Sequence, residues 1–312
     1  MVLRSLLILI YKFLNLTAAL YHKSKASPGI ILMGLKDKES EFDIIIDPDH
    51  IQKEYIRDLY RYRELFYFFA WRDMVVRYKQ TFLGVLWAII RPILNMAVFV
   101  FVFGKIAKLD SSAISYPLFV FSGLLPWQLF TASLIDSSNS LIQSAPVISK
   151  VYFPRVILPF TCIVTNFADF LISLCLFLVL MPLLGSFEHS SFLLMPLFII
   201  QAVLLCLGTS LWISALTVRF RDLRFLVPFI VQFGIFISPI GYSSFLVPGI
   251  WFWLYLLNPM VGIIEGFRWC CFGIYHPDLP AAMIISLLIN SALLISGFRY
   301  FRKMENIFAD IL

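Results

Sequence analysis

Ionisable side chains inside apolar stretches are the first places in this 312-residue chain where chemistry could occur. Asp169 lies midway along a long apolar run, Asp136 lies near the end of another, and Glu265 lies in a third that is broken by Pro and Gly. Ionisable groups at membrane depth often act as relays for protons or ions. A satisfied polar contact between two helices explains Asp169 equally well, and the sequence leaves both interpretations open.

Patterns for enzymatic chemistry are missing. The four histidines are scattered, no HExxH motif occurs, and the five cysteines lie in apolar stretches without metal-ligand spacing. The phosphate-binding loop GxxxxGK[ST] is also missing, because Leu35 and Lys36 follow the glycine pair Gly29 and Gly34. We therefore expect no catalytic residue, no metal, no cofactor bound by this chain and no nucleotide hydrolysis by it alone.

The composition is that of an integral membrane protein. Hydrophobic residues make up 60% and charged residues 14%, whereas soluble domains contain roughly 45–50% and 25%. This excludes a cytosolic enzyme, a secreted disulfide scaffold and a disordered tail.

The apolar runs predict an all-α fold with six transmembrane helices. A span needs about 20 mostly apolar residues, and the candidates are 82–104, 116–138, 156–184, 192–217, 225–246 and 279–299. Residues 247–272 are apolar but interrupted by Pro and Gly, which favours a re-entrant pair of short helices before the last span.

Residues 59–80 predict an amphipathic helix that lies in the cytoplasmic membrane interface. Apolar and basic residues recur there at helical spacing, with Arg72, Arg77 and Lys79 directed toward lipid headgroups. We expect a cytoplasmic extension over 1–57, the interfacial helix over 58–81, the transmembrane domain over 82–300 and a cytoplasmic tail over 301–312. Within the extension, residues 42–46 look strand-like.

The basic residues predict the orientation. Of the 25 Lys and Arg, 21 fall on one side of this topology, while Lys105, Lys108 and Arg268 fall on the other and Arg91 lies in the first span. Cytoplasmic flanks carry the excess of positive charge, so both termini are expected in the cytoplasm. The net charge of +6 then reflects topology, and a nucleic-acid partner is not expected.

Several polar strings at fixed membrane positions carry a family resemblance. They are WRD at 71–73, RYKQT at 77–81, LGVLWA at 83–88 with Pro92, KVYFPR at 150–155 with LP at 158–159, RFRDL at 219–223 and LNPM at 257–260. Together, over roughly residues 58–300, they resemble the membrane permease subunit of ABC exporters for polysaccharides of the O-antigen, capsule or teichoic-acid type.

The resemblance implies a transport subunit of the bacterial inner membrane. It implies a homodimeric pore, two separate ATPase subunits that bind ATP and Mg²⁺, and a polysaccharide or polyol-phosphate polymer on an isoprenoid pyrophosphate lipid as substrate. The alternatives are an ABC permease for a lipid or drug-like molecule, an ion-coupled secondary transporter and a membrane-bound glycan enzyme.

The resemblance also implies roles for particular residues, each with a simpler alternative. Coupling to the ATPase is the role implied for Lys150, Tyr152, Phe153, Pro154 and Arg155. The simpler alternative is that these residues form an ordinary basic turn. Contact with the lipid carrier, or with ordinary anionic lipids, is assigned to Arg72, Arg77, Lys79 and Arg91. Stacking on sugar rings in the pore, or an interfacial aromatic belt, is assigned to Trp87, Tyr116, Trp127, Tyr242, Trp251, Trp253 and Tyr255.

Overall fold

A computed structural model describes residues 51–79, 84, 86–106, 114–184, 190–305 and 307–308. The chain divides into two compact units, residues 1–56 and 57–312. The helical bundle belongs to the second unit, and helix α2 (Ile51–Arg61) spans the division. The strand-like stretch 42–46, most of the predicted extension and the end of the tail lie outside the described residues.

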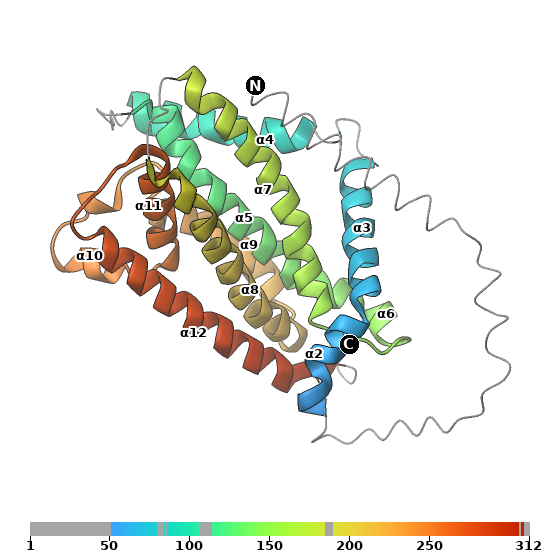
Figure 1. The fold of residues 1–312 in the computed structure, drawn as a ribbon. Coiled ribbons are helices and arrows are strands. Elements are labelled where there is room, and N and C mark those ends of the chain that lie inside the picture. Colours follow the sequence, from blue (N-terminus) through green and yellow to red (C-terminus); the bar gives the residue numbers. More distant parts are fainter. Residues whose placement is uncertain are drawn as a thin grey trace, which may run out of the picture. The chain divides into compact units, whose positions relative to one another are not determined.

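Long apolar helices dominate the described part of the chain, which contains no strand (Figure 1). Five of them are long and apolar enough to cross a membrane: Leu86–Ile106, Tyr116–Gln143, Ile157–Leu183, Ser191–Arg219 and Leu279–Glu305. The first consists of α4 (Leu86–Phe99) and a π-helical continuation, η1 (Val100–Ile106). The others contain α5 (Tyr116–Gln143), α7 (Ile157–Leu183), α8 (Met195–Arg219) with η2 (Ser190–Leu194) before it, and α12 (Leu279–Glu305).

The predicted span 225–246 is a shorter helix than expected. Helix α9 covers only Leu223–Ile237, 15 residues, or about 22 Å at the helical rise per residue. It ends because Ser238 precedes Pro239 and adopts an extended conformation (φ −92°, ψ 149°), as the residue before a proline commonly does. A short 3₁₀ helix, η3 (Ser244–Leu246), follows.

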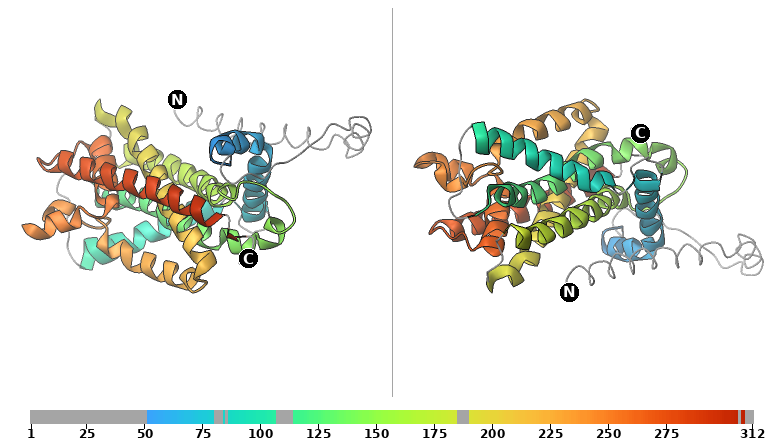
Figure 2. Two further views of the ribbon diagram at one scale, coloured as in Figure 1. Left: turned by 90° about the horizontal axis from the view of Figure 1, so that it is seen from below. Right: turned by 90° about the horizontal axis from the view of Figure 1, so that it is seen from above.

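Helix α5 forms the centre of the bundle. It contacts α4, α7, α8, α9 and α11, and the views in Figure 2 show these helices around it. Leu118, Val120, Phe121 and Leu124 on this helix are completely buried. The first half of α5 is apolar on nearly all sides, as expected for a helix in the core of a large bundle.

Helices α8 and α12 pack with their backbones in contact. A Cβ atom added to Gly208 would lie 2.7 Å from the backbone nitrogen of Leu294, and one added to Gly297 would lie 2.4 Å from the carbonyl oxygen of Gly208. Small residues permit this close approach, as they do in many membrane helix pairs. The two helices are therefore fixed to each other along much of their length.

Two short helices occupy the stretch 247–272, as its prolines and glycines predicted. They are α10 (Ile250–Tyr255) and α11 (Pro259–Phe272). Asn258 caps α11 by accepting a hydrogen bond of 3.1 Å from the amide of Met260, and Pro259 starts the helix. Nearly all of α11 is buried against α5, α8 and α12. Its depth in the membrane stays a prediction.

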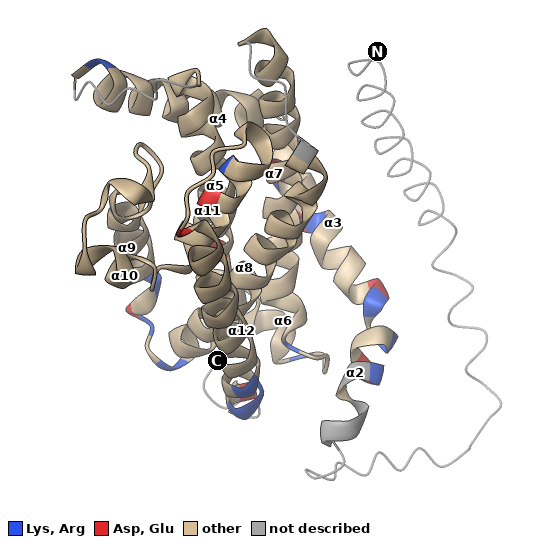
Figure 3. Ribbon diagram, turned by 60° about the vertical axis from the view of Figure 1, so that its left-hand side comes forward, with Lys and Arg blue, Asp and Glu red and all other residues tan. Residues whose placement is uncertain are grey.

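The remaining helices lie before and after these spans. Helix α3 (Arg63–Lys79) packs on α7, and the short α6 (Ala145–Ile148) follows α5. Lys and Arg gather at the bundle end where α12 finishes and α9 begins (Figure 3). This grouping matches the charge asymmetry read from the sequence, although it does not by itself fix which side faces the cytoplasm.

Candidate functional site

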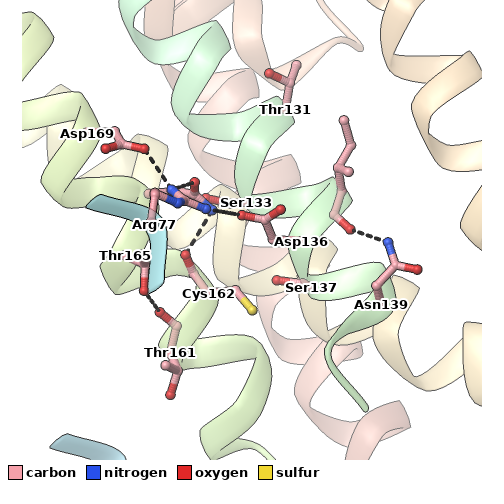
Figure 4. Close-up of polar contacts among 12 residues, drawn as sticks. Arg77, Thr131, Ser133, Asp136, Ser137, Asn139, Thr161, Cys162, Thr165 and Asp169 are labelled. Atoms are coloured by element: carbon pink, nitrogen blue, oxygen red, sulfur yellow. Dashed lines mark hydrogen bonds and ion pairs between the residues drawn. The ribbon is translucent and has the colours of Figure 1, made fainter. Parts of the chain in front are cut away.

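Arg77, in the last turn of α3, joins three helices through its guanidinium group (Figure 4). Its Nη2 lies 2.7 Å from Oδ2 of Asp136 on α5, and its Nη1 lies 2.7 Å from Oδ2 of Asp169 on α7. Nη1 also donates a hydrogen bond of 2.7 Å to the side-chain oxygen of Asn166. Tyr78 donates its hydroxyl hydrogen to Asp169. We call Arg77, Tyr78, Asp136, Asn166 and Asp169 the Arg77 cluster.

The Arg77 cluster carries an excess of negative charge and is only partly buried. One guanidinium faces two carboxylates, and the side chains of Arg77, Asp136 and Asp169 are 32%, 37% and 33% exposed. Burial alone would lower the pKa of Arg77, but the two carboxylates outweigh that effect and raise it. Arg77 is therefore a permanent cation. Asp169 makes the interhelical polar contact that the sequence left as one of two interpretations.

The other cations predicted for lipid-carrier contact have different surroundings. Arg72 is exposed and pairs with its neighbour Asp73 at 2.8 Å, and its guanidinium lies 4.9 Å from the ring of Phe69. Lys79 and, on α4, Arg91 are also exposed. Arg77 alone of the four turns into the bundle, so an incoming phosphate would have to compete with two carboxylates for it.

The loop between α6 and α7, residues 149–156, is part exposed and part built into the bundle. Lys150 and Tyr152 are exposed, Tyr152 at 69%, whereas Phe153 is only 2% exposed and Pro154 is buried. The Phe153 ring packs 5.7 Å from the Phe69 ring of α3. Of the residues predicted to couple to an ATPase, only Lys150 and Tyr152 are therefore exposed enough to contact a partner protein.

Arg155 ties the same loop to the end of α12. Its backbone amide donates a hydrogen bond of 2.7 Å to the Glu305 carboxylate, and its guanidinium donates to the Glu305 carbonyl oxygen. The loop is therefore bonded to α12 through Arg155 and packed on α3 through Phe153. Sequence reasoning could not find this, because Glu305 lies 150 residues away.

The predicted pore aromatics do not form one group within the chain. Trp127 is buried, and Tyr116 donates a hydrogen bond of 2.7 Å to the carbonyl of Gly241. The hydroxyls of Tyr255 and Tyr242 are 3.0 Å apart. The exposed members are Trp87 on α4 and, on α10, Trp251 and Trp253.

A second arginine cluster, which the sequence analysis did not identify, surrounds Arg268 of α11. Arg268 is completely buried. Its guanidinium donates to the carbonyl oxygens of Ile240 (2.8 Å) and Tyr242 (3.2 Å), and it lies 3.6 Å from the ring centroid of Phe119. We call Arg268, Phe119 and the residues that Arg268 bonds the Arg268 cluster.

Glu265 completes the Arg268 cluster. Its Oε1 lies 3.4 Å from Nη1 of Arg268 and accepts hydrogen bonds from the amide (2.8 Å) and hydroxyl (2.9 Å) of Ser244. The cluster fixes the segment after α9 onto α11. An acidic and a basic residue three positions apart in an apolar stretch, such as Glu265 and Arg268, indicate an ion pair on one face of a helix.

Comparison with known proteins identifies the class of this bundle. Residues 64–272 match the family described as ABC-2 type transporter. The chain is 29% identical over 257 residues to "O-antigen export system permease protein RfbA" of Myxococcus xanthus, covering 82% of this chain and 98% of that protein. It is 30% identical over 243 residues to the protein of the same name from Klebsiella pneumoniae, covering 77% and 92%.

A more distant relative is named for the transport of a different polysaccharide. "Polysialic acid transport protein KpsM" of Escherichia coli is 26% identical over 200 residues, covering 62% of this chain and 76% of that protein. In the described residues, no three His, Cys, Asp or Glu side chains are grouped so that they could hold a metal ion. The chain is a multi-pass membrane protein and belongs to the ABC-2 type transporter family, whose permeases work with ATPase partners.

Proposed function

We propose that this chain is the permease subunit of an ATP-driven exporter that moves lipid-linked polysaccharide or polyol-phosphate polymer across the bacterial inner membrane. The roles of its relatives, O-antigen export and polysialic acid transport, support this substrate class. In the proposal two copies form the pore, and two ATPase subunits bind ATP and Mg²⁺. Both termini face the cytoplasm, consistent with the clustered basic residues.

The observation that carries the proposal is the double attachment of the 149–156 loop. Phe153 packs on Phe69 of α3, and Arg155 is bonded to Glu305 at the end of α12. The neighbouring Tyr152 is exposed. An ATPase that displaces the exposed residues would therefore move two helices at once, one that precedes the first span and one that is the last.

The Arg77 cluster supports a role for α3 in receiving the lipid carrier. Arg72 and Lys79 are exposed and could make the first charge-assisted contacts with a pyrophosphate. The phosphate could then replace Asp136 or Asp169 as a partner of Arg77, which would release α3 from α5 or α7. Arg91 is exposed on α4 and could contribute in the same way.

The test of the proposal uses the permease co-purified with its ATPase and reconstituted in vesicles. We expect Tyr152→Asp to abolish most polymer export while ATP hydrolysis continues, because an added charge disrupts an apolar docking contact. Tyr275→Asp is the matched control, since Tyr275 is similarly exposed, at 61%, but lies just before α12 rather than near its end. Normal export by the Tyr152 variant would contradict coupling through this loop.

Deletion of the gene distinguishes the alternatives. The proposal predicts that lipid-linked polymer accumulates inside the cell. Absence of accumulation, with an ATPase still co-purifying, would favour a permease for lipids or drug-like molecules. Transport that follows an ion gradient and needs no ATPase would favour a secondary transporter.

A further inference from the structure

A cavity of about 270 Å³ lies beside the short helix α10, apart from both arginine clusters. Its walls come from η3, from α10 and from the loop that leads into α12. The lining residues are Phe245, Val247, Gly249, Phe252, Trp253, His276 and Asp278.

The cavity lies at the opposite end of α12 from the 149–156 loop. Asp278 immediately precedes α12, which begins at Leu279, whereas Glu305 at its other end bonds to Arg155. A straight helix of 27 residues is about 40 Å long, more than the hydrocarbon thickness of a membrane. In the orientation proposed above, with the basic Glu305 end of α12 in the cytoplasm, the cavity lies on the outer side of the membrane.

Four of the seven lining residues carry aromatic rings. His276 stacks on Phe245 with ring centroids 4.0 Å apart and an interplanar angle of 14°. Phe252 is buried and packs against both Phe245 and Trp253, with centroids 5.9 and 6.0 Å apart. Trp253 is 55% exposed, so part of its ring is available to a ligand.

One acidic side chain stands among these rings. The carboxylate of Asp278 lies 3.5 Å from Nδ1 of His276, and its backbone amide donates a hydrogen bond of 3.3 Å to the same nitrogen. The Asp278 side chain is 49% exposed, so it keeps free acceptor positions. On the opposite wall, a Cβ atom added to Gly249 would meet nothing within 4 Å, which leaves the space open.

This combination suits a sugar ring. A pyranose presents C–H groups on one face, which pack against the negative face of an aromatic ring, and hydroxyl groups at its edge. A carboxylate accepts hydrogen bonds from hydroxyls and donates none. Asp278 is the one acidic residue in the lining, so it would repel a ligand that carries a carboxylate group.

We propose that this cavity binds one neutral pyranose unit of the polymer on the outer side of the membrane, with the sugar face on Trp253 and its hydroxyls on Asp278. The inference rests on the proposed function. It adds to the predicted aromatic Trp253 the carboxylate of Asp278, which binds the polar edge of the sugar, and His276, which lies beside Asp278. The cavity thereby gives the exported chain a contact after it has crossed the bundle.

The test is saturation-transfer difference NMR on the full-length protein with its ATPase, in lipid nanodiscs free of sugar-based detergent. The probes are the methyl glycosides of glucose, galactose and mannose, with methyl glucuronide as the charged comparison. We expect transfer to at least one neutral probe and little to the glucuronide. Trp253→Ala should weaken binding about three- to tenfold, the range for one lost aromatic contact.

Two further variants keep the result interpretable. Asp278→Asn keeps the shape of the side chain and should also weaken binding, so it serves if Trp253→Ala fails to fold. Leu254→Ala is the matched control, because Leu254 of the same helix is about as exposed as Trp253, at 54%, and does not line the cavity. It should bind the probes as the unmodified protein does.

The outcomes separate the cavity from the transport function. Absence of transfer to every neutral probe, or equal losses in the Trp253→Ala and Leu254→Ala variants, would overturn the sugar site even if deletion of the gene traps polymer inside the cell. Probe binding that depends on Trp253 and Asp278 would support the site. If deletion then traps no polymer, the proposed function fails while the site stands.

Discussion

Arg77 lies one-third exposed between two carboxylates, whereas Arg268 is completely buried and bonds mainly to backbone carbonyl oxygens. Both side chains join segments that are distant in the sequence. The partners of Arg77 are side chains on α5 and α7, while those of Arg268 are the backbone after α9, Glu265 and the ring of Phe119.

The difference in surroundings sets how easily each arginine can be released. Separating Arg77 from its partners should cost less, because partly exposed ion pairs contribute less to stability than fully buried ones. Removing Arg268 from its partners would leave the buried charge of Glu265 without its counter-ion and the carbonyl groups of Ile240 and Tyr242 without these hydrogen bonds, which is unfavourable. We therefore expect the Arg77 cluster to open and close during transport and the Arg268 cluster to stay closed.

Replacement of Arg268 should have the largest effect. We expect Arg268→Met to lower the free energy of unfolding by about 3–5 kcal/mol, the cost of breaking a buried ion pair. The measurement is a denaturation titration of the purified protein in micelles. Arg91→Met is the control, because Arg91 is exposed on α4, and it should change little. If the two variants were equally stable, Arg268 would not be holding the segment after α9 onto α11.

Replacement of Arg77 should have an intermediate effect on stability and a specific effect on motion. Arg77→Met should lower the free energy of unfolding by about 1–2 kcal/mol, less than for the buried pair because its side chain and those of its partners are one-third exposed. Hydrogen exchange of the α3 amides should become faster. Arg72→Met removes a cation whose salt bridge is to Asp73 on the same helix, and it should leave this exchange unchanged.

A double-mutant cycle would sharpen the assignment of Arg77. If Arg77 and Asp169 act through their ion pair, the loss in Arg77→Met together with Asp169→Asn should be smaller than the sum of the single losses. Additive losses would mean that Arg77 stabilises α3 through other contacts. Unchanged hydrogen exchange in α3 would contradict its role as a reversible attachment.

Removal of the Tyr78 hydroxyl should have the smallest effect. Tyr78→Phe deletes the hydrogen bond to Asp169 and should cost about 0.5–1.5 kcal/mol, the net value of one such bond. Denaturation of this variant beside Arg77→Met would rank the two contacts to Asp169. A Tyr78 loss as large as that of Arg77 would place the hydroxyl, rather than the guanidinium, at the centre of the cluster.

The sequence predicted the helices better than the contacts between them. Apolar length identified the five long helices, and the prolines and glycines of 247–272 identified two short ones. The pairing of Arg77 with Asp169 joins residues 92 positions apart. The sequence identified Asp169 as an ionisable group in an apolar run. The residues next to it in the sequence do not indicate its partner, because contacts between helices depend on how the bundle packs.

Two other differences have local causes. The end of α9 could have been predicted, since Ser238 precedes Pro239 and a residue before proline tends to leave the helical conformation. The prediction placed the end of the helix too late because the apolar run continues beyond Pro239. The burial of Phe153 was not readable, because an aromatic residue in a basic loop can face a partner protein or its own core. Only the position of Phe69 on α3 decides between them.

The glycine contact between α8 and α12 has a mechanical consequence. Because the two backbones already touch at Gly208 and Gly297, α8 and α12 cannot move closer together there, and we expect them to move as a pair. One end of α12 is bonded to Arg155, and the other begins directly after Asp278. We therefore expect a displacement of the 149–156 loop to shift the wall of the cavity at the far end of α12 as well.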